Sequence, residues 1–318
     1  METHRTTESA EAFVAAQRLK PDDPDLKLDC VTALLAAGRT DEGKTMLNTF
    51  ADIDGSARAQ SLLGEVDEKE RKFQDAGRHF ARALELEPNE ENAWQLSDDL
   101  LQHWAFDAAI VELRAASQKF PDSKRLKLGL GAALFGGAKY SEAIPVFADL
   151  LAAQPGNAWY AELLGMACTA PLLAPNARCA ALVTFAQANP GNAKASTDAA
   201  SFLMKHEAEQ QNVDLARKLL QHALAIEPKL PEAQFEMGAL LQDGEDWKGS
   251  IPFLKRAVRL KPDFSQAHYR LARAYWRTGR KEEGDAQMAL QRKSANQNQI
   301  ELDQRLRQVT SLAVTVQQ

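Results

Sequence analysis

Small and large apolar residues recur along this chain at spacings of four and three, with polar residues between them. Such spacings place the apolar side chains on one face of a helix. A proline follows five residues after the last apolar position, and proline cannot continue a helix because it lacks an N–H. The pattern therefore predicts a series of helices that each end just before a proline. Its best examples are Ala76-Phe80-Ala83-Pro88, Ala109-Leu113-Ala116-Pro121, Ala143-Phe147-Leu150-Pro155, Ala216-Leu220-Ala223-Pro228 and Ser250-Leu254-Ala257-Pro262.

These stops recur at 33 to 38 residues, when Asp54 is counted at the place of a missing proline. A second mark, a Leu-Gly pair or a close variant, begins 25 residues before the stop in four repeats. Glycine within a helix costs about 1 kcal/mol relative to alanine, which is tolerated where a second backbone passes close by. Each repeat is therefore predicted to be two antiparallel helices joined by a short turn. The pairs are Leu63-Gly64, Leu96-Ser97, Leu130-Gly131 and Met237-Gly238, and the turns are Ala37-Gly38-Arg39, Gly136-Gly137, Asp243-Gly244 and Thr278-Gly279-Arg280.

This arrangement resembles the tetratricopeptide repeat (TPR), whose pattern places a Leu-Gly pair in the first helix and Ala, Phe, Ala and Pro in the second. The best matches are residues 57–89, 124–157, 231–264 and 265–290. The resemblance implies an all-α fold, a right-handed α-solenoid (superhelix) of antiparallel helix pairs. It also implies a non-catalytic scaffold or adaptor that binds protein or peptide segments in its concave groove.

The predicted organisation has three parts. Residues 1–23 form an N-terminal half-repeat or capping helix, so the chain is either a piece of a longer protein or begins with a natural single-helix cap. The TPR array occupies residues 24–281 and continues to about residue 295. Residues 282–318 form the rest of the last second helix and a C-terminal capping helix. The apolar seam of that helix either covers the array end or mediates self-association; it comprises Leu302, Leu306, Val309, Ala313 and Val316.

Two repeats in the middle depart from the pattern. Residues 158–192 contain Pro171 and Pro175, so the first helix must end early and the turn must be irregular. Residues 193–230 carry about four extra residues, which we expect to lengthen the turn near residues 206–213.

The composition adds limits on compartment and partner. With 45% hydrophobic and 26% charged residues, the chain is typical of a folded protein. A net charge of −6 argues against attraction of the whole molecule to nucleic acid or an anionic membrane. There is no apolar run of about 18 residues, so no transmembrane segment is expected. No signal core follows Met1, which favours the cytoplasm, although an exported protein with a removed signal would look the same.

No residue pattern indicates an enzyme. The six histidines form no H-E-x-x-H pair and no close set with cysteine, so neither a metal site nor a cofactor is predicted. The glycines around Gly131 and Gly137 lack the strand and the lysine position of a phosphate-binding loop. Cys168 and Cys179 flank the proline-broken turn. They either pair as a disulfide or are two small apolar core residues, and the second interpretation is the favoured one.

The resemblance also implies which side chains face a ligand, because first helices line the groove in this family. In the last repeat, aromatic rings beside guanidinium groups suit an acidic or extended peptide. The alternative is that Tyr269 and Trp276 pack under the capping helix and the arginines are merely solvated. The matching positions are Trp94, Asp98, Leu128 and Phe135, followed by Gln266, Tyr269, Arg273, Trp276 and Arg277.

Charge is distributed unevenly along the chain. Residues 248–281 contain ten bases and one acid, Asp263. Such a segment would steer an acidic protein, pair with the acidic end of another copy or, less favourably, bind nucleic acid. A further alternative is the targeting or assembly arm of a larger enzyme or of a secretion or envelope assembly machine. No small-molecule substrate is predicted.

Overall fold

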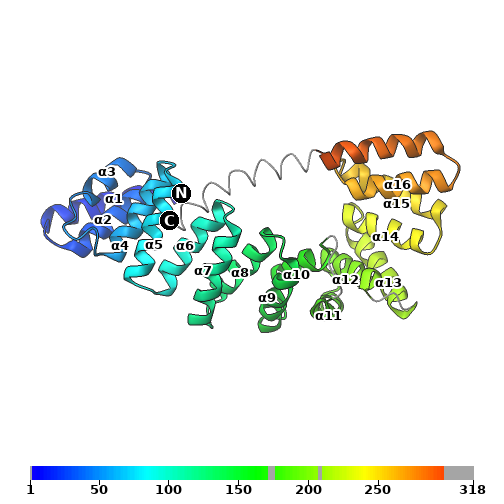
Figure 1. The fold of residues 1–318 in the computed structure, drawn as a ribbon, viewed down its shortest axis with the longest axis horizontal. Coiled ribbons are helices and arrows are strands. Elements are labelled where there is room, and N and C mark those ends of the chain that lie inside the picture. Colours follow the sequence, from blue (N-terminus) through cyan, green and yellow to red (C-terminus); the bar gives the residue numbers. More distant parts are fainter. Residues whose placement is uncertain (1, 171–175, 207–209, 297–318) are drawn as a thin grey trace. The chain divides into compact units, whose positions relative to one another are not determined.

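A computed structural model describes residues 2–170, 176–206 and 210–296 (Figure 1). All regular elements in these residues are helices and none is a strand, so the predicted all-α solenoid of antiparallel helix pairs is confirmed. The helices group into two compact units, here called the N-terminal unit (to Ala133) and the C-terminal unit (from Leu134), with the division inside α8.

The helices of the N-terminal unit are α1 (Glu2–Leu19), α2 (Pro24–Ala36), α3 (Thr40–Leu47), α4 (Ala57–Lys69), α5 (Phe73–Leu86), α6 (Glu90–Gln102), α7 (Phe106–Lys119) and α8 (Lys124–Gly136), which crosses the division. Those of the C-terminal unit are α9 (Tyr140–Ala153), α10 (Ala158–Cys168), the 3₁₀ helix η1 (Ala177–Cys179), α11 (Ala180–Ala188), α12 (Ala193–His206), α13 (Gln210–Ile226), α14 (Pro231–Asp243), α15 (Trp247–Leu260) and α16 (Ser265–Arg277). Residues 281–296 continue as helix after α16.

The first helix of several repeats begins at a capping side chain or at a proline. Asp23, Ser56 and Asn89 each accept a hydrogen bond from the backbone N–H three residues further on, at 3.1, 3.2 and 2.8 Å. These side chains satisfy N–H groups that have no partner within the helix. Pro24 and Pro231 occupy first helical positions, where the missing N–H costs nothing.

The turn inside each regular repeat has one residue in the left-handed region. Only two of these residues are glycines, although the sequence predicts glycine-containing turns at four places. In two of those turns the left-handed position falls one residue after the predicted glycines, on Ala138 and Glu245. The residues with positive φ are Gly38, Arg71, Trp104, Ala138, Glu245 and Gly279.

The small residue of the first helix is required by a side chain rather than by a backbone. A Cβ on Gly64 would lie 2.7 Å from the ring of Phe80, and a Cβ on Gly238 would lie 2.6 Å from Leu254. Phe80 and Leu254 are the large members of the small-large-small faces, and both are buried. The sequence predicts that another backbone passes close to this glycine. In the structure, a large side chain of the same repeat occupies that space instead.

Both ends of the described chain are helical. Residues 2–19 form one helix, α1, which packs on α2 with Ala10 fully buried. Residues 281–296 pack on α16, where His268 lies 2.7 Å from Oε1 of Gln287 and the Gln291 amide donates to the Ser265 hydroxyl. The predicted seam from Leu302 to Val316 lies outside the described residues, as do Pro171 and Pro175.

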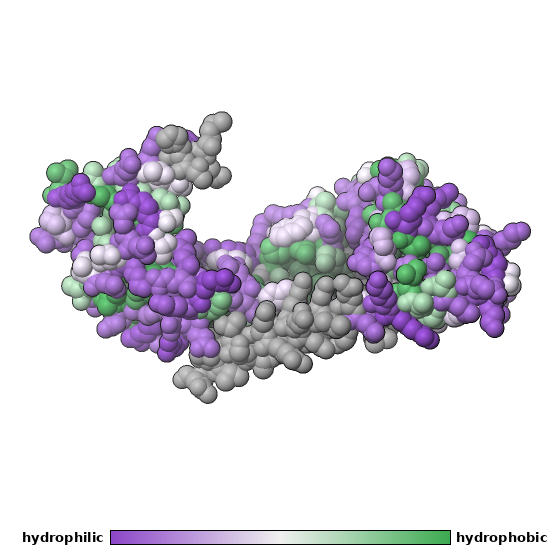
Figure 2. Space-filling view, turned by 90° about the horizontal axis from the view of Figure 1, so that it is seen from above, coloured by the Kyte–Doolittle hydropathy of each residue, from purple (hydrophilic) through white to green (hydrophobic). Residues whose placement is uncertain are grey.

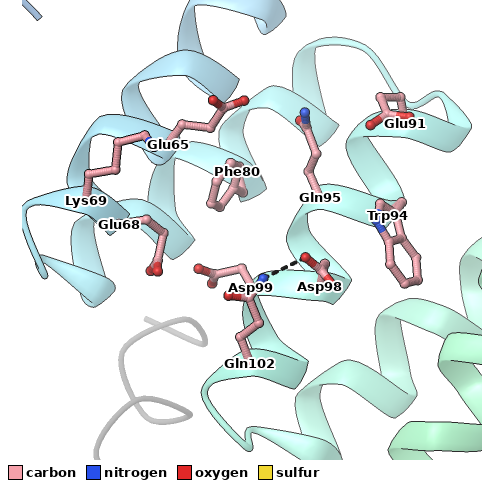
Figure 3. A pocket seen from close by; sticks show the side chains of 10 residues that line it. All are labelled: Glu65, Glu68, Lys69, Phe80, Glu91, Trp94, Gln95, Asp98, Asp99 and Gln102. Carbon is pink, nitrogen blue, oxygen red and sulfur yellow. Dashed lines mark hydrogen bonds between the residues drawn. The ribbon is translucent and has the colours of Figure 1, made fainter. Parts of the chain in front are cut away.

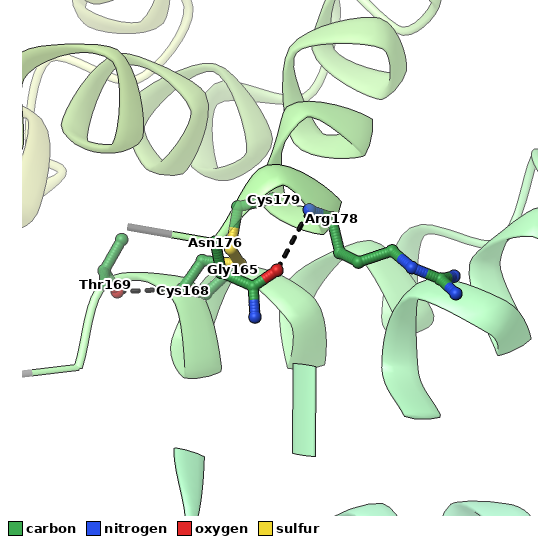
Figure 4. Close-up of a disulfide and its surroundings, with 6 residues drawn as sticks. All are labelled: Gly165, Cys168, Thr169, Asn176, Arg178 and Cys179. Atoms are coloured by element: carbon green, nitrogen blue, oxygen red, sulfur yellow. Dashed lines mark hydrogen bonds between the residues drawn. A yellow bond between two sulfur atoms is a disulfide. The ribbon is translucent and has the colours of Figure 1, made fainter. Parts of the chain in front are cut away.

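A disulfide joins Cys168 to Cys179 (Figure 4), which corrects the favoured interpretation of two unpaired core residues. Both cysteines are fully buried, and their Cα atoms are 5.9 Å apart. The predicted early end of the first helix is confirmed, since α10 ends at Cys168 after 11 residues where most first helices have 13. The bond links the end of α10 to η1.

The prediction of a lengthened turn in residues 193–230 is wrong. Here α12 has 14 residues and α13 has 17, compared with 13 and 14 for α14 and α15. The four extra residues are therefore accounted for by longer helices. Because a helix residue adds an internal hydrogen bond, extending a helix is favourable where its added face packs or is polar.

The surface that each unit presents is mainly hydrophilic, with apolar residues interspersed (Figure 2). Within the described residues, no helix is both long and apolar enough to span a bilayer.

Candidate partner-binding site

Two guanidinium groups of α16 lie against the ring of Trp247, the first residue of α15. The guanidinium carbons of Arg273 and Arg277 are 5.4 and 5.2 Å from the centre of this ring. Arg273 also lies 5.9 Å from the ring of Tyr269. Tyr269, Arg273 and Arg277 are four residues apart, so they share one face of the helix. We call these four residues the arginine–aromatic cluster.

The local sequence explains the position of Trp247. Asp246 caps α15 by accepting a hydrogen bond from the Gly249 N–H at 2.7 Å, which fixes where the helix begins. The left-handed Glu245 turns the chain immediately before this cap. Trp247 is half-buried, and its ring lies beside α16, the first helix of the next repeat. The two arginines thus find a preformed aromatic surface.

The charges of the cluster are not neutralised within the described part of the chain. Neither Arg273 nor Arg277 forms an ion pair or a side-chain hydrogen bond with another described residue. Other cations of residues 248–281 do have such partners: Lys261 pairs with Glu232 at 3.4 Å and Arg270 with Asp243 at 3.0 Å. Contacts with aromatic faces are worth about 0.5–1 kcal/mol at exposed sites and leave the N–H donors available. The two groups are therefore oriented but still able to bind an anion.

Tyr269 of the cluster is 44% exposed. The two other residues predicted on this helix lie outside the cluster. Gln266 is exposed. Trp276 is 39% exposed, but its Nε1–H donates to Asp285 at 3.1 Å, and a Cβ on Gly284 would lie 2.4 Å from its ring. Trp276 therefore packs on the following helical segment, and its described contacts are not with the cluster.

In the N-terminal unit, Trp94 and Asp98 of α6 line one pocket (Figure 3). The pocket has a volume of about 320 Å³ and is formed by side chains of α4, α5 and α6. The ring of Trp94 lies 5.3 Å from the guanidinium of Arg125, and Asp98 accepts from the Gln102 amide at 2.7 Å. The lining residues are Glu65, Glu68, Lys69, Phe80, Glu91, Trp94, Gln95, Asp98, Asp99 and Gln102.

Leu128 and Phe135 do not line this pocket. Leu128 is half-buried on α8 in the N-terminal unit. Phe135 is half-buried in the C-terminal unit, where its ring centre lies 5.2 Å from that of Tyr140.

The pocket is acidic, and burial alters two of its carboxyl groups. It contains five carboxyl side chains and one amine, that of Lys69. Burial raises the pKa of Asp99 to about 8, with the negative charge of nearby Glu68 as the next cause. Burial also raises the pKa of Glu65, against a smaller opposing effect of Lys69. This pocket is thus suited to cations, in contrast to the arginine–aromatic cluster.

Models of the family described as Tetratricopeptide repeat match residues 1–66 and 100–167 and, separately, residues 235–295. No curated protein matches in a sequence comparison.

Similar solved structures include YrrB, described as a TPR protein with an unusual peptide-binding site. It is 18% identical, with coverage of 70% of this chain and 96% of YrrB and a TM-score of 0.41. The Cut9–Hcn1 hetero-tetramer of APC/C is 15% identical, with coverage of 98% and 62% and a TM-score of 0.49. PilF of Pseudomonas aeruginosa is 17% identical, with coverage of 77% and 94% and a TM-score of 0.39.

Proposed function

The chain belongs to the tetratricopeptide repeat family, and we propose that it is a non-catalytic scaffold that binds an acidic segment of a partner protein. The binding site is the arginine–aromatic cluster of Trp247, Tyr269, Arg273 and Arg277. Stacked helix pairs offer an extended surface along which a peptide can lie, which is the mechanical basis for such a role.

One observation carries this proposal: two guanidinium groups are held on one aromatic ring without an acidic partner among the described residues. A carboxylate accepts two parallel N–H bonds from one guanidinium, and such charge-assisted bonds are stronger than neutral ones. Because Trp247 already restricts both side chains, less rotamer freedom is lost on binding. The exposed ring of Tyr269 adds an apolar contact beside the charges.

The test uses fluorescence anisotropy with the full chain and a fluorescein-labelled dodecapeptide of alternating glutamate and alanine. Arg273→Glu with Arg277→Glu is expected to weaken binding by more than about tenfold, since one hydrogen bond to a charged group is worth about 1.5–3 kcal/mol. The melting temperature should change little, because neither arginine has an ion-pair partner to lose.

The matched control is Arg256→Glu with Arg259→Glu. These exposed cations lie on α15 outside the cluster, and their reversal changes the net charge by the same amount. Equal weakening by the control would show attraction to overall charge only and would overturn the assignment of the site. Equal binding of an alternating lysine–alanine peptide would overturn the acidic preference. Tighter binding of a labelled single-stranded oligonucleotide than of the peptide would favour the nucleic-acid alternative.

A further inference from the structure

Glu68, Asp99 and His103 meet in the N-terminal unit although they come from two helices. Nε2 of His103 lies 2.8 Å from Oε1 of Glu68 and 3.9 Å from Oδ1 of Asp99. One ligand atom from each residue lies within 4.8 Å of the other two. Glu68 belongs to α4, whereas Asp99 and His103 are four residues apart at the end of α6 and so share a face. Figure 3 shows the carboxylates of Glu68 and Asp99 turned toward one another.

One side-chain oxygen of Asp99 lacks a hydrogen-bond partner among the described residues. Its side chain is 5% exposed, and Oδ1 is buried without a hydrogen bond to any described residue. A buried carboxylate oxygen without a partner is unfavourable, because water has been removed and nothing has replaced it. Since this oxygen is directed at His103 and Glu68, a cation bound between the three groups would complete its coordination.

Glu68 and Asp99 place two carboxyl groups close together beside the imidazole. Two carboxylates placed together are unfavourable unless a proton or a metal ion offsets their repulsion.

Local structure holds the imidazole in place. His103 ends α6, and its backbone N–H donates to the Asp99 carbonyl at 3.1 Å. The ring of Phe73 lies 4.3 Å from the imidazole. The next residue, Trp104, has a positive φ, so the chain turns away directly after the histidine. The nitrogen ligand is therefore positioned by packing before any ion arrives.

We propose that Glu68, Asp99 and His103 bind a divalent transition-metal ion of the Zn²⁺ type. Imidazole nitrogen selects such ions over Mg²⁺ and Ca²⁺, which prefer oxygen ligands only. Bonds of about 2.0–2.2 Å require ligand atoms roughly 3–4 Å apart, so the present separations need only small side-chain movements. Three protein ligands leave a coordination position open. Glu68 and Asp99 also line the pocket, so we expect that position to face it.

The test is calorimetric titration of the full chain with Zn²⁺ after treatment with a chelator. We expect a saturable site for one ion that Asp99→Asn or His103→Gln weakens by more than about tenfold. Removal of a residue that only supports a metal ligand already costs 10- to 100-fold. The matched control is His79→Gln on α5, because His79 also lies near a carboxylate, that of Asp67 at 3.5 Å, but has no second acid within ion-pair distance among the described residues.

A thermal readout separates a ligand from a merely structural residue. Zn²⁺ should raise the melting temperature of the unaltered chain and of the His79 variant but not that of Asp99→Asn. If His103→Gln proves unstable, the visible absorption of bound Co²⁺ in the unaltered and Asp99→Asn chains gives an independent measurement. Absence of saturable binding, or equal loss in the His79 variant, would overturn the proposal. Neither result bears on the arginine–aromatic cluster, which lies in the other unit.

Discussion

Gly238→Ala tests whether the glycine of the first helix is required by a side chain of the second. An added Cβ would lie 2.6 Å from Cγ and 2.8 Å from Cδ2 of Leu254. Leu254 is fully buried in a core with Phe235, Leu271 and Tyr275, so it cannot move away freely. Overpacking costs about 1–3 kcal/mol, whereas glycine to alanine within a helix gains about 1 kcal/mol. The net expectation is a destabilisation of up to about 2 kcal/mol.

The decisive measurement places the same change in a Leu254→Ala background. There the obstructing side chain is gone, so Gly238→Ala should stabilise that variant by about 1 kcal/mol, the helix propensity alone. Urea unfolding of the four chains, followed by far-UV circular dichroism, gives the coupling free energy. Gly244→Ala serves as the control, since a Cβ there meets nothing closer than 3.6 Å. If Gly238→Ala destabilises both backgrounds equally, the contact with Leu254 is not the reason for the glycine.

Two further predictions concern the C-terminal unit. Reduction of the Cys168–Cys179 bond should lower the free energy of unfolding by about 3 kcal/mol, the loop-closure value for a sequence separation of 11 residues. Urea unfolding of the double variant Cys168→Ala with Cys179→Ala should not respond to the reductant. An unchanged melt of the unaltered chain, with thiol titration showing the bond reduced, would contradict this. Glu236 accepts a hydrogen bond from the Ser201 hydroxyl at 2.7 Å, and burial raises the pKa of its carboxyl group. The unfolded chain therefore loses this proton at a lower pH than the folded chain, so the free energy of unfolding falls as pH rises from the unfolded pKa of about 4.3 toward the higher folded value. Glu236→Gln should therefore raise the melting temperature at pH 8 and leave it nearly unchanged at pH 4, and an equal effect at both would contradict the role of ionisation.

The packing of the repeats was largely predictable from the sequence. Ala76, Phe80 and Ala83 form a predicted helix face, and all three are buried. Such a face is readable because it repeats in register and because burial of apolar area dominates the free energy of folding. The turns were less predictable. The left-handed positions at Ala138 and Glu245 follow the glycines by one residue, because helix pairing imposes a conformation that costs a non-glycine residue only about 1–2 kcal/mol.

The chemistry of the sites was only partly readable. The spacing of Arg273 and Arg277 predicts a shared face, but Trp247 lies in the preceding repeat, and no spacing rule connects it to them. Asp99 and His103 likewise share a helix face, whereas Glu68 comes from the previous repeat. Contacts between repeats depend on how the helices stack, and a single sequence specifies that stacking only through the sum of many packing contacts.

The two candidate sites share one feature of the repeat. An aromatic residue is the first residue of four second helices, and each ring contacts a side chain close to the end of a first helix. These contacts are Phe73 with His103, Phe106 with Trp104, Tyr140 with Phe135, and Trp247 with Arg277. The recurring ring packs between a second helix and the end of a first helix, so its presence alone indicates packing and not a binding site. What lies against the ring differs: an imidazole beside two carboxylates in one unit, and guanidinium groups without acidic partners among the described residues in the other. We therefore propose that function in this array belongs to the positions where repeats in the same register differ, and that the shared ring only orients the side chains there.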